Sequence, residues 1–169
     1  DINTTGAVDI GGTITASRDV EIGRERGAES VKVGGLITSG DATKYIQGAT
    51  KIYARGDIET TGIDARGKVV LISSNDNDKV KYTDADGIDA PEGAGKITLN
   101  GKITTTASSS DAVYISTQGK FINKTTGGSA ITVGTDTRDP NNTKVGNWTI
   151  FSATPYADTF GTNLNSNNS

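Results

Sequence analysis

A short phrase recurs along this chain and constrains its fold more than any other feature of the sequence. The phrase has two apolar residues separated by one position, a polar or glycine break, and then Gly-x-Ile-x-Thr or a close relative. Its clearest copies lie at 8–15, 31–38, 52–59 and 97–104, and weaker copies begin at positions 70, 113 and 131. The spacing averages about 20 residues, and repetition at such a period is typical of proteins built from stacked structural units.

The phrase predicts short β-strands with one buried face. Apolar and polar residues alternate within it and the glycines mark bends, so we expect two short strands per repeat, joined at corners. Strands this short cannot bury their own apolar face, but coils stacked about 4.8 Å apart would bury a continuous column of side chains. The sequence therefore predicts an all-β fold, a right-handed parallel β-helix (solenoid) of about six to seven coils with loop excursions. One internal column is expected to contain Ile14, Ile37, Ile58 and Ile103.

The composition favours strands and turns over helices. The chain of 169 residues contains 17 Ile and 10 Val but only 4 Leu, together with 25 Thr and 22 Gly. β-Branched side chains fit a pleated sheet and crowd a helix, so a helical bundle is excluded. A β-sandwich is the structural alternative, but it calls for longer strands, hairpin turns such as Asn-Gly and more aromatic residues.

The repeat runs through most of the chain, which predicts a single structural unit. We expect one β-helix segment over 1–160, with a closing segment at 145–160 and a flexible tail at 161–169. Two polar stretches, 73–93 and 135–143, interrupt the repeat and are expected to form surface loops that carry binding specificity. The first residues lack the basic start and apolar stretch of a signal peptide, as expected of a mature or excised segment.

Missing residue types narrow the chemistry. The chain has no Cys and no His, which excludes disulfides, typical zinc sites and nucleophiles activated by an imidazole base. The net charge is −3, with Lys and Arg scattered among Asp and Glu, so we expect no nucleic-acid partner. No apolar run approaches the roughly 20 residues of a membrane span. Carboxylates alone could support polysaccharide cleavage, and a polysaccharide-binding or polysaccharide-cleaving β-helix stays an alternative.

The coils and the segment that follows them resemble a known family. Repeats of Gly-x-Ile-x-Thr followed by Trp148, Phe151, Ser152 and Pro155 are similar to filamentous haemagglutinin-like adhesins, the large exoproteins of two-partner secretion. In many of those proteins a Trp-x-x-aromatic-Ser-x-x-Pro segment closes a stretch of β-helix, although Tyr is commoner at the place of Phe151. The secretion domain of the family, with its Asn-Pro-Asn motifs, is not visible in this sequence.

The resemblance implies an internal or C-terminal segment of a secreted or cell-surface bacterial adhesin, associated with virulence. The expected function is that of a stiff, non-catalytic stalk that presents binding surfaces to a host or bacterial cell-surface protein or glycan. The alternative is a structural subunit that polymerises end to end, because an open β-helix end exposes unpaired backbone groups that must be capped or joined.

Arg55-Gly56-Asp57 is the candidate receptor-binding site. The tripeptide is the one that integrins recognise. Gly56 aligns with the repeat glycines Gly12, Gly35 and Gly101, however, which would place it at a coil corner and not on a protruding loop. Receptor recognition and a structural corner are both open interpretations.

Asp84, Asp86 and Asp89 form the candidate metal site. They offer hard oxygen ligands in a glycine-containing turn, which suits calcium, and no other cofactor is expected. The spacing lacks the full pattern of an EF-hand loop, and Asp and Gly are also ordinary turn residues.

Two further patterns are common in a chain rich in Asn and Thr. Asn-x-Thr sequons, acceptors for N-glycosylation, occur at Asn3, Asn123, Asn141 and Asn147. Pairs such as Thr13 and Thr15 would suit a flat ice-binding surface, but they do not recur at a constant period.

Overall fold

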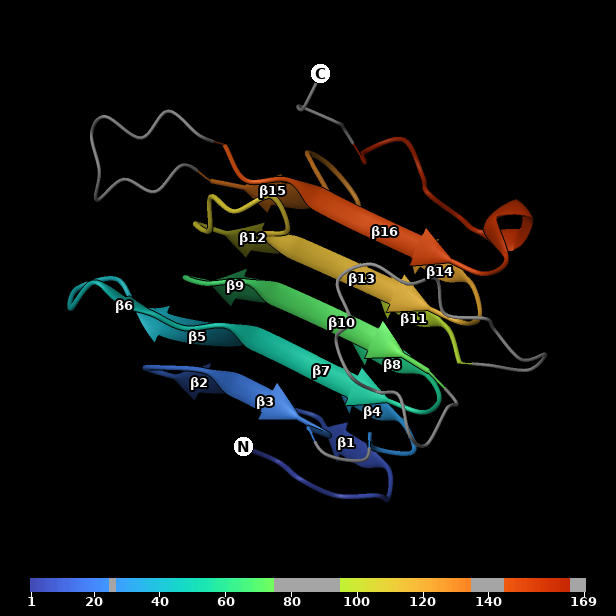
Figure 1. The fold of residues 1–169 in the computed structure, drawn as a ribbon, viewed down its shortest axis with the longest axis horizontal. Coiled ribbons are helices and arrows are strands. Elements are labelled where there is room, and N and C mark those ends of the chain that lie inside the picture. Colours follow the sequence, from blue (N-terminus) through green and yellow to red (C-terminus); the bar gives the residue numbers. More distant parts are fainter. Residues whose placement is uncertain (25–26, 75–94, 135–144, 165–169) are drawn as a thin grey trace.

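The computed structural model describes residues 1–24, 27–74, 95–134 and 145–164, which form three parallel β-sheets wound into a solenoid (Figure 1). Sheet 1 contains β1 (Val8–Ile10), β4 (Val31–Val33), β8 (Ile58–Thr60), β11 (Ile97–Leu99) and β14 (Phe121–Asn123). Sheet 2 contains β2 (Ile14–Ala16), β5 (Ile37–Asp41), β9 (Ile63–Ala65), β12 (Ile103–Thr105) and β15 (Ile131–Val133). Sheet 3 contains β3 (Val20–Ile22), β7 (Thr50–Ala54), β10 (Val69–Ser73), β13 (Val113–Thr117) and β16 (Trp148–Ser152).

Each complete turn of the chain supplies one strand to each sheet, and strands of successive turns pair in parallel. The described residues form five complete turns, and single bridges from Ile2 to Ile22 and from Ile122 to Thr159 extend the stack at both ends. In Figure 1 the near strands of sheet 3 run left to right while the chain climbs from bottom to top, so the coil is right-handed. The predicted right-handed parallel β-helix of about six to seven coils is therefore confirmed, with about six coils in the described residues.

The sequence predicted the repeat unit less accurately than it predicted the fold. Each turn has three strands and not the expected two, and the seven phrases begin on all three sheets. Turns begin at register-matched positions 8, 31, 58, 97 and 121, so the coils are longer and less even than the phrase spacing suggested. The short apparent period arose because corners of different sheets carry similar Gly-x-Ile motifs.

Apolar side chains fill the solenoid in continuous columns. The column under sheet 2 contains Ile14, Ile37, Ile63, Ile103 and Ile131. The column under sheet 1 contains Val8, Val31, Ile58, Ile97 and Phe121. The expected column was thus correct for Ile14, Ile37 and Ile103 but wrong for Ile58, which is buried in the neighbouring column.

Hydroxyl groups at the corners connect one turn to the previous one. The last residue of a sheet 3 strand donates to a glycine carbonyl one turn below, with Oγ···O distances of 2.7 Å for Ser73 to Gly56 and 3.1 Å for Ser152 to Gly119. Thr117 donates in the same way to Gly95 at 2.7 Å. These bonds give the corner carbonyls a hydroxyl donor from the next turn, and the Gly95 carbonyl also accepts the Gly119 N–H at 3.0 Å.

Thr60 breaks this pattern and provides a stability test. It lies between Val33 and Leu99 in an apolar column, is fully buried, and its hydroxyl has no hydrogen-bond partner. Burying an unpaired hydroxyl costs about 1–3 kcal/mol, so Thr60→Val should raise the free energy of unfolding by about 1 kcal/mol in denaturant titrations. The matched control is Thr105→Val, because the Thr105 hydroxyl donates to the Gly67 carbonyl at 2.6 Å. Equal destabilisation by both substitutions would contradict the assignment.

Within the ranges that the structure describes, one hairpin leaves the solenoid. β5 continues past the other strands of sheet 2 and pairs antiparallel with β6 (Ile46–Gln47), so that residues 40–47 project from the second turn (Figure 1). Asp41 Oδ1 holds the tip by accepting hydrogen bonds from the backbone N–H groups of Thr43 and Lys44.

No helix in the described ranges is long and apolar enough to cross a membrane.

Candidate functional site

The outward side of sheet 3 differs from the outward sides of the other two sheets. In sheet 2 the central outward residues are polar: Thr15, Thr38, Asp64, Thr104 and Thr132. Sheet 1 presents Asp9, Lys32, Glu59, Thr98 and Ile122. The corresponding positions of β7, β10, β13 and β16 are mainly apolar or aromatic: Lys51, Tyr53, Val70, Ile72, Tyr114, Ser116, Thr149 and Phe151.

These outward residues form a second, smaller apolar cluster. Tyr53, Val70 and Ile72 are only 8%, 5% and 2% exposed, and Tyr114 packs against them. The Tyr114 and Phe151 rings lie 5.7 Å apart between centroids, and Phe151 remains 55% exposed. Sheet 3 is thus apolar on both sides over its central strands. Because Tyr53, Val70 and Ile72 are themselves buried, the candidate binding surface is the accessible part of the outward side, at Phe151 and around the hollow described next.

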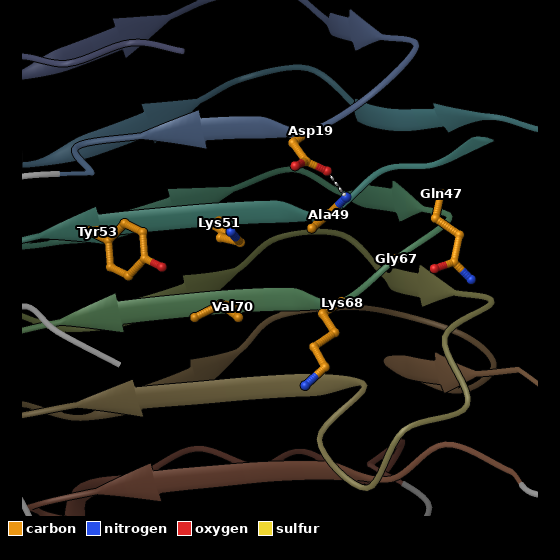
Figure 2. Close-up of a pocket in the computed structure, with 8 residues that line it drawn as sticks. All are labelled: Asp19, Gln47, Ala49, Lys51, Tyr53, Gly67, Lys68 and Val70. Carbon is orange, nitrogen blue, oxygen red and sulfur yellow. Dashed lines mark hydrogen bonds between the residues drawn. The ribbon is translucent and has the colours of Figure 1, made fainter. Parts of the chain in front are cut away.

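A surface hollow of about 370 Å³ lies on this side of sheet 3 (Figure 2). It is lined by Asp19, Gln47, Ala49, Lys51, Tyr53, Gly67, Lys68 and Val70. Two neighbouring strands, β7 and β10, provide its floor, and the corners that precede them provide the polar rim. Tyr53 and Gln47 lie at opposite ends of the group (Figure 2).

The lysines of the hollow are already paired with carboxylates. Lys51 Nζ donates a hydrogen bond to Glu21 Oε1 at 2.8 Å, and this bond raises the pKa of Lys51. Lys68 Nζ lies 2.7 Å from both carboxylate oxygens of Asp111. Burial raises the pKa of the Tyr53 hydroxyl, which therefore stays protonated and able to donate a hydrogen bond at neutral pH.

Sequence reasoning missed this surface, although a signal was present. Val69–Ile72 is an unbroken apolar run, whereas a strand with one buried side alternates. Such a run indicates a strand covered on both sides. The expected binding loops at 73–93 and 135–143 lie almost entirely outside the described residues and stay predictions.

Arg55-Gly56-Asp57 forms the corner between β7 and β8, as expected of a coil corner. The Arg55 guanidinium donates from Nη2 to the Thr5 carbonyl at 2.6 Å. Asp57 accepts from the Lys96 backbone N–H at 2.9 Å and pairs with Lys96 Nζ at 2.8 Å. Both side chains are therefore held by the chain itself. Recognition of the tripeptide by a receptor stays a prediction.

The alignment of Gly56 with Gly12, Gly35 and Gly101 was wrong. Those three glycines precede sheet 2 strands, whereas Gly56 precedes a sheet 1 strand and stacks under Gly95. A Cβ at Gly56 would come within 2.6 Å of the Glu29 carbonyl oxygen, so close stacking requires glycine here.

Asp57 gives a pH prediction. Partial burial raises the pKa of its carboxyl, but the hydrogen bonds and charge of Lys96 outweigh that effect and hold the pKa below its ordinary value of 3.8. A carboxyl whose pKa is lower in the folded chain than in the unfolded chain stabilises the fold at pH values above its unfolded pKa. This contribution is lost as the pH falls through the folded pKa. Asp57→Asn should therefore reduce the loss of stability below about pH 4 in denaturant titrations.

The control for this experiment is Asp64→Asn, because Asp64 is exposed and forms no ion pair in the described part of the chain. It should leave the acid dependence unchanged. If Asp57→Asn has the same acid dependence as the parent chain, the Lys96 pair does not stabilise the folded state.

The remaining candidates are placed only in part. Asp84, Asp86 and Asp89 lie outside the described residues, so calcium binding stays a prediction. The described residues bring no three Asp or Glu side chains together as a metal-binding group.

Asn123 is only 6% exposed, and its amide donates to the Phe160 carbonyl and to Asn163 Oδ1, so this sequon is blocked in the folded chain. Asn3 and Asn147 are exposed.

The segment that suggested a family closes the last turn. Pro155 begins a 3-10 turn, η1 (Pro155–Ala157), after which Asp158 Oδ1 accepts the Phe121 N–H at 2.7 Å and lies 2.8 Å from Ser152 Oγ. Thr159 then exchanges backbone hydrogen bonds with β14.

Comparison with protein families, curated proteins and solved structures found no match to this chain.

Proposed function

We propose that this chain is a non-catalytic, extracellular β-helical segment of a bacterial surface or secreted adhesin. It acts as a stiff stalk and presents a binding surface to a protein or glycan on another cell. The observation that carries the proposal is the combination of one unbroken internal core with an outward side of sheet 3 that is apolar and aromatic. The resemblance of the coils and of Trp148–Pro155 to haemagglutinin-like exoproteins supports the same function.

Rigidity follows from the way the turns are connected. Each internal turn contacts the next through three strands, a filled column of apolar side chains and hydroxyl bonds at the corners. Interiors packed in this way are close to crystal density and have low compressibility. A rigid segment of this kind holds its two ends at a fixed distance from each other, as a stalk requires.

A subunit that polymerises end to end is the alternative to a stalk. In a straight stack, each sheet of one copy would continue into the same sheet of the next copy. The parallel bridges of Ile2 to Ile22 and of Ile122 to Thr159 extend sheets 3 and 1 in the same sense. Sedimentation at increasing protein concentration should detect no filaments, and concentration-dependent filaments would favour the alternative.

Attachment of coated beads tests the proposal. Beads that carry the purified chain should adhere to epithelial or bacterial cell layers, and the soluble chain should compete with them. Beads blocked with albumin provide the control. If coated beads adhere no better than blocked beads to every cell layer tried, the chain has no presenting surface of its own and the adhesin proposal fails for this segment.

A further inference from the structure

We propose that the hollow on the outward side of sheet 3 binds a short segment of a neutral glycan chain. Asp19, Gln47 and Tyr53 would hydrogen bond to sugar hydroxyls, and the β7 and β10 surface would support the ring. This inference rests on the proposed function and deepens it, because it names the partner class and the surface that takes it.

Three uncommitted polar groups surround the hollow. Asp19 uses one carboxylate oxygen to accept the Ala49 N–H at 2.8 Å, and its other oxygen has no hydrogen-bond partner in the described part of the chain. The Gln47 side chain is exposed, and its amide is unpaired within the same ranges. The Tyr53 side chain lines the hollow but is only 8% exposed, and its hydroxyl is likewise unpaired there. Together they offer an acceptor, an amide that both donates and accepts, and a hydroxyl that does the same.

The floor of the hollow is apolar where these groups leave it uncovered. Ala49, Gly67 and Val70 lie between the polar rim residues (Figure 2). A sugar ring presents hydroxyls at its edge and C–H groups on its face, so it matches a rim of hydrogen-bonding groups around an apolar floor. The volume of about 370 Å³ lies within the range of about 300–1,000 Å³ typical of small-ligand sites.

Charge selects a neutral ligand over an anionic one. Lys51 and Lys68 are each paired with a carboxylate at 2.8 Å or less, and Asp19 adds a third carboxylate beside these two ammonium groups. The hollow therefore has no uncompensated positive charge to attract a sulfate, a phosphate or a sialic acid carboxylate.

Backbone amide NMR of the ¹⁵N-labelled chain tests the proposal. The probes are cellohexaose, maltohexaose and N-acetylchitohexaose as neutral glycans, and a heparin hexasaccharide as an anionic one. We expect at least one neutral probe to shift amides within 47–53 and 67–70 in a saturable way, and the heparin probe to leave them unchanged.

A double substitution, Gln47→Ala with Tyr53→Phe, should raise the Kd of that probe at least about tenfold. Both changes remove groups that form no hydrogen bond within the described chain, so the fold should persist. The matched control is Thr104→Ala, an exposed outward position on sheet 2, which should leave the Kd unchanged.

Three results would overturn the saccharide assignment: no shift at these amides with any neutral probe, tighter binding of heparin there, or a Kd unaffected by the double substitution. If coated beads still attach to cells while any of these three results is obtained, the stalk proposal holds but its partner or binding surface is a different one. If bead attachment and saccharide binding are both absent, both proposals fail.

Discussion

Truncation of Ile37 to alanine is expected to lower the free energy of unfolding by about 2–5 kcal/mol. Ile37 is fully buried and lies between Ile14 and Ile63 in the column under sheet 2. Removal of its side chain leaves a cavity that backbone pairing on both sides prevents from collapsing. Ile58, fully buried between Val31 and Ile97 in the neighbouring column, should show a loss of similar size.

The control for this truncation is Ile14→Ala at the first turn. Ile14 occupies the same column but is only partly buried, because no complete turn lies beneath it among the described residues. Its truncation should cost clearly less in the same urea titration. A loss within about 0.5 kcal/mol at Ile37 and Ile58 would show that these side chains do not face a packed interior.

Replacement of Gly101 by alanine is expected to cost about 1–3 kcal/mol or more, because the added methyl group has no room. A Cβ at this corner would overlap the Thr61 carbonyl oxygen and lie 3.2 Å from the Gly62 nitrogen. Both neighbours are backbone atoms held in the turn below, so neither can move without disturbing the stacking. The expected result is a lower midpoint of chemical unfolding with retained far-UV β-structure.

Gly12 is the matched control for Gly101. It precedes β2 by the same number of positions as Gly101 precedes β12, yet a Cβ there has no heavy atom within 4 Å. Gly12→Ala should therefore be neutral or slightly stabilising, since it also restricts the unfolded chain. If both substitutions had equal effects, steric stacking would not explain the corner glycines.

Much of the fold could be predicted because the physical signal is local. Alternation in phrases such as Val31–Val33 requires only neighbouring residues, and it correctly indicated strands with one face inward. The need for short strands to bury that face against copies of themselves then gave the parallel solenoid. These steps require no knowledge of which strand joins which sheet.

Assignment of strands to sheets could not be made from the same signal. Gly56-x-Ile58 and Gly101-x-Ile103 have the same spacing, but the first leads into sheet 1 and the second into sheet 2. The corner that a glycine occupies depends on the atoms of the turn beneath it, which spacing alone does not contain. For the same reason Ile58 was predicted to lie in the column under sheet 2, whereas it lies in the column under sheet 1.

The candidate site depends on contacts distant in sequence and was therefore missed. Asp19 and Lys51 reach the same hollow from different turns, and Lys68 joins them from a third. Only parallel stacking brings such residues together. The β5–β6 hairpin was missed for a related reason, since its residues fit within an ordinary repeat interval and gave no change in spacing.

Binding without turnover is the central claim, and one measurement tests it directly. The purified chain is incubated with each of the three neutral hexasaccharides, and the sugars are then separated into bound and free fractions and sized by mass spectrometry. The account predicts that at least one hexasaccharide is retained by the chain and recovered at its original length. Shortened products with new reducing ends, abolished by replacement of a specific Asp or Glu, would contradict it.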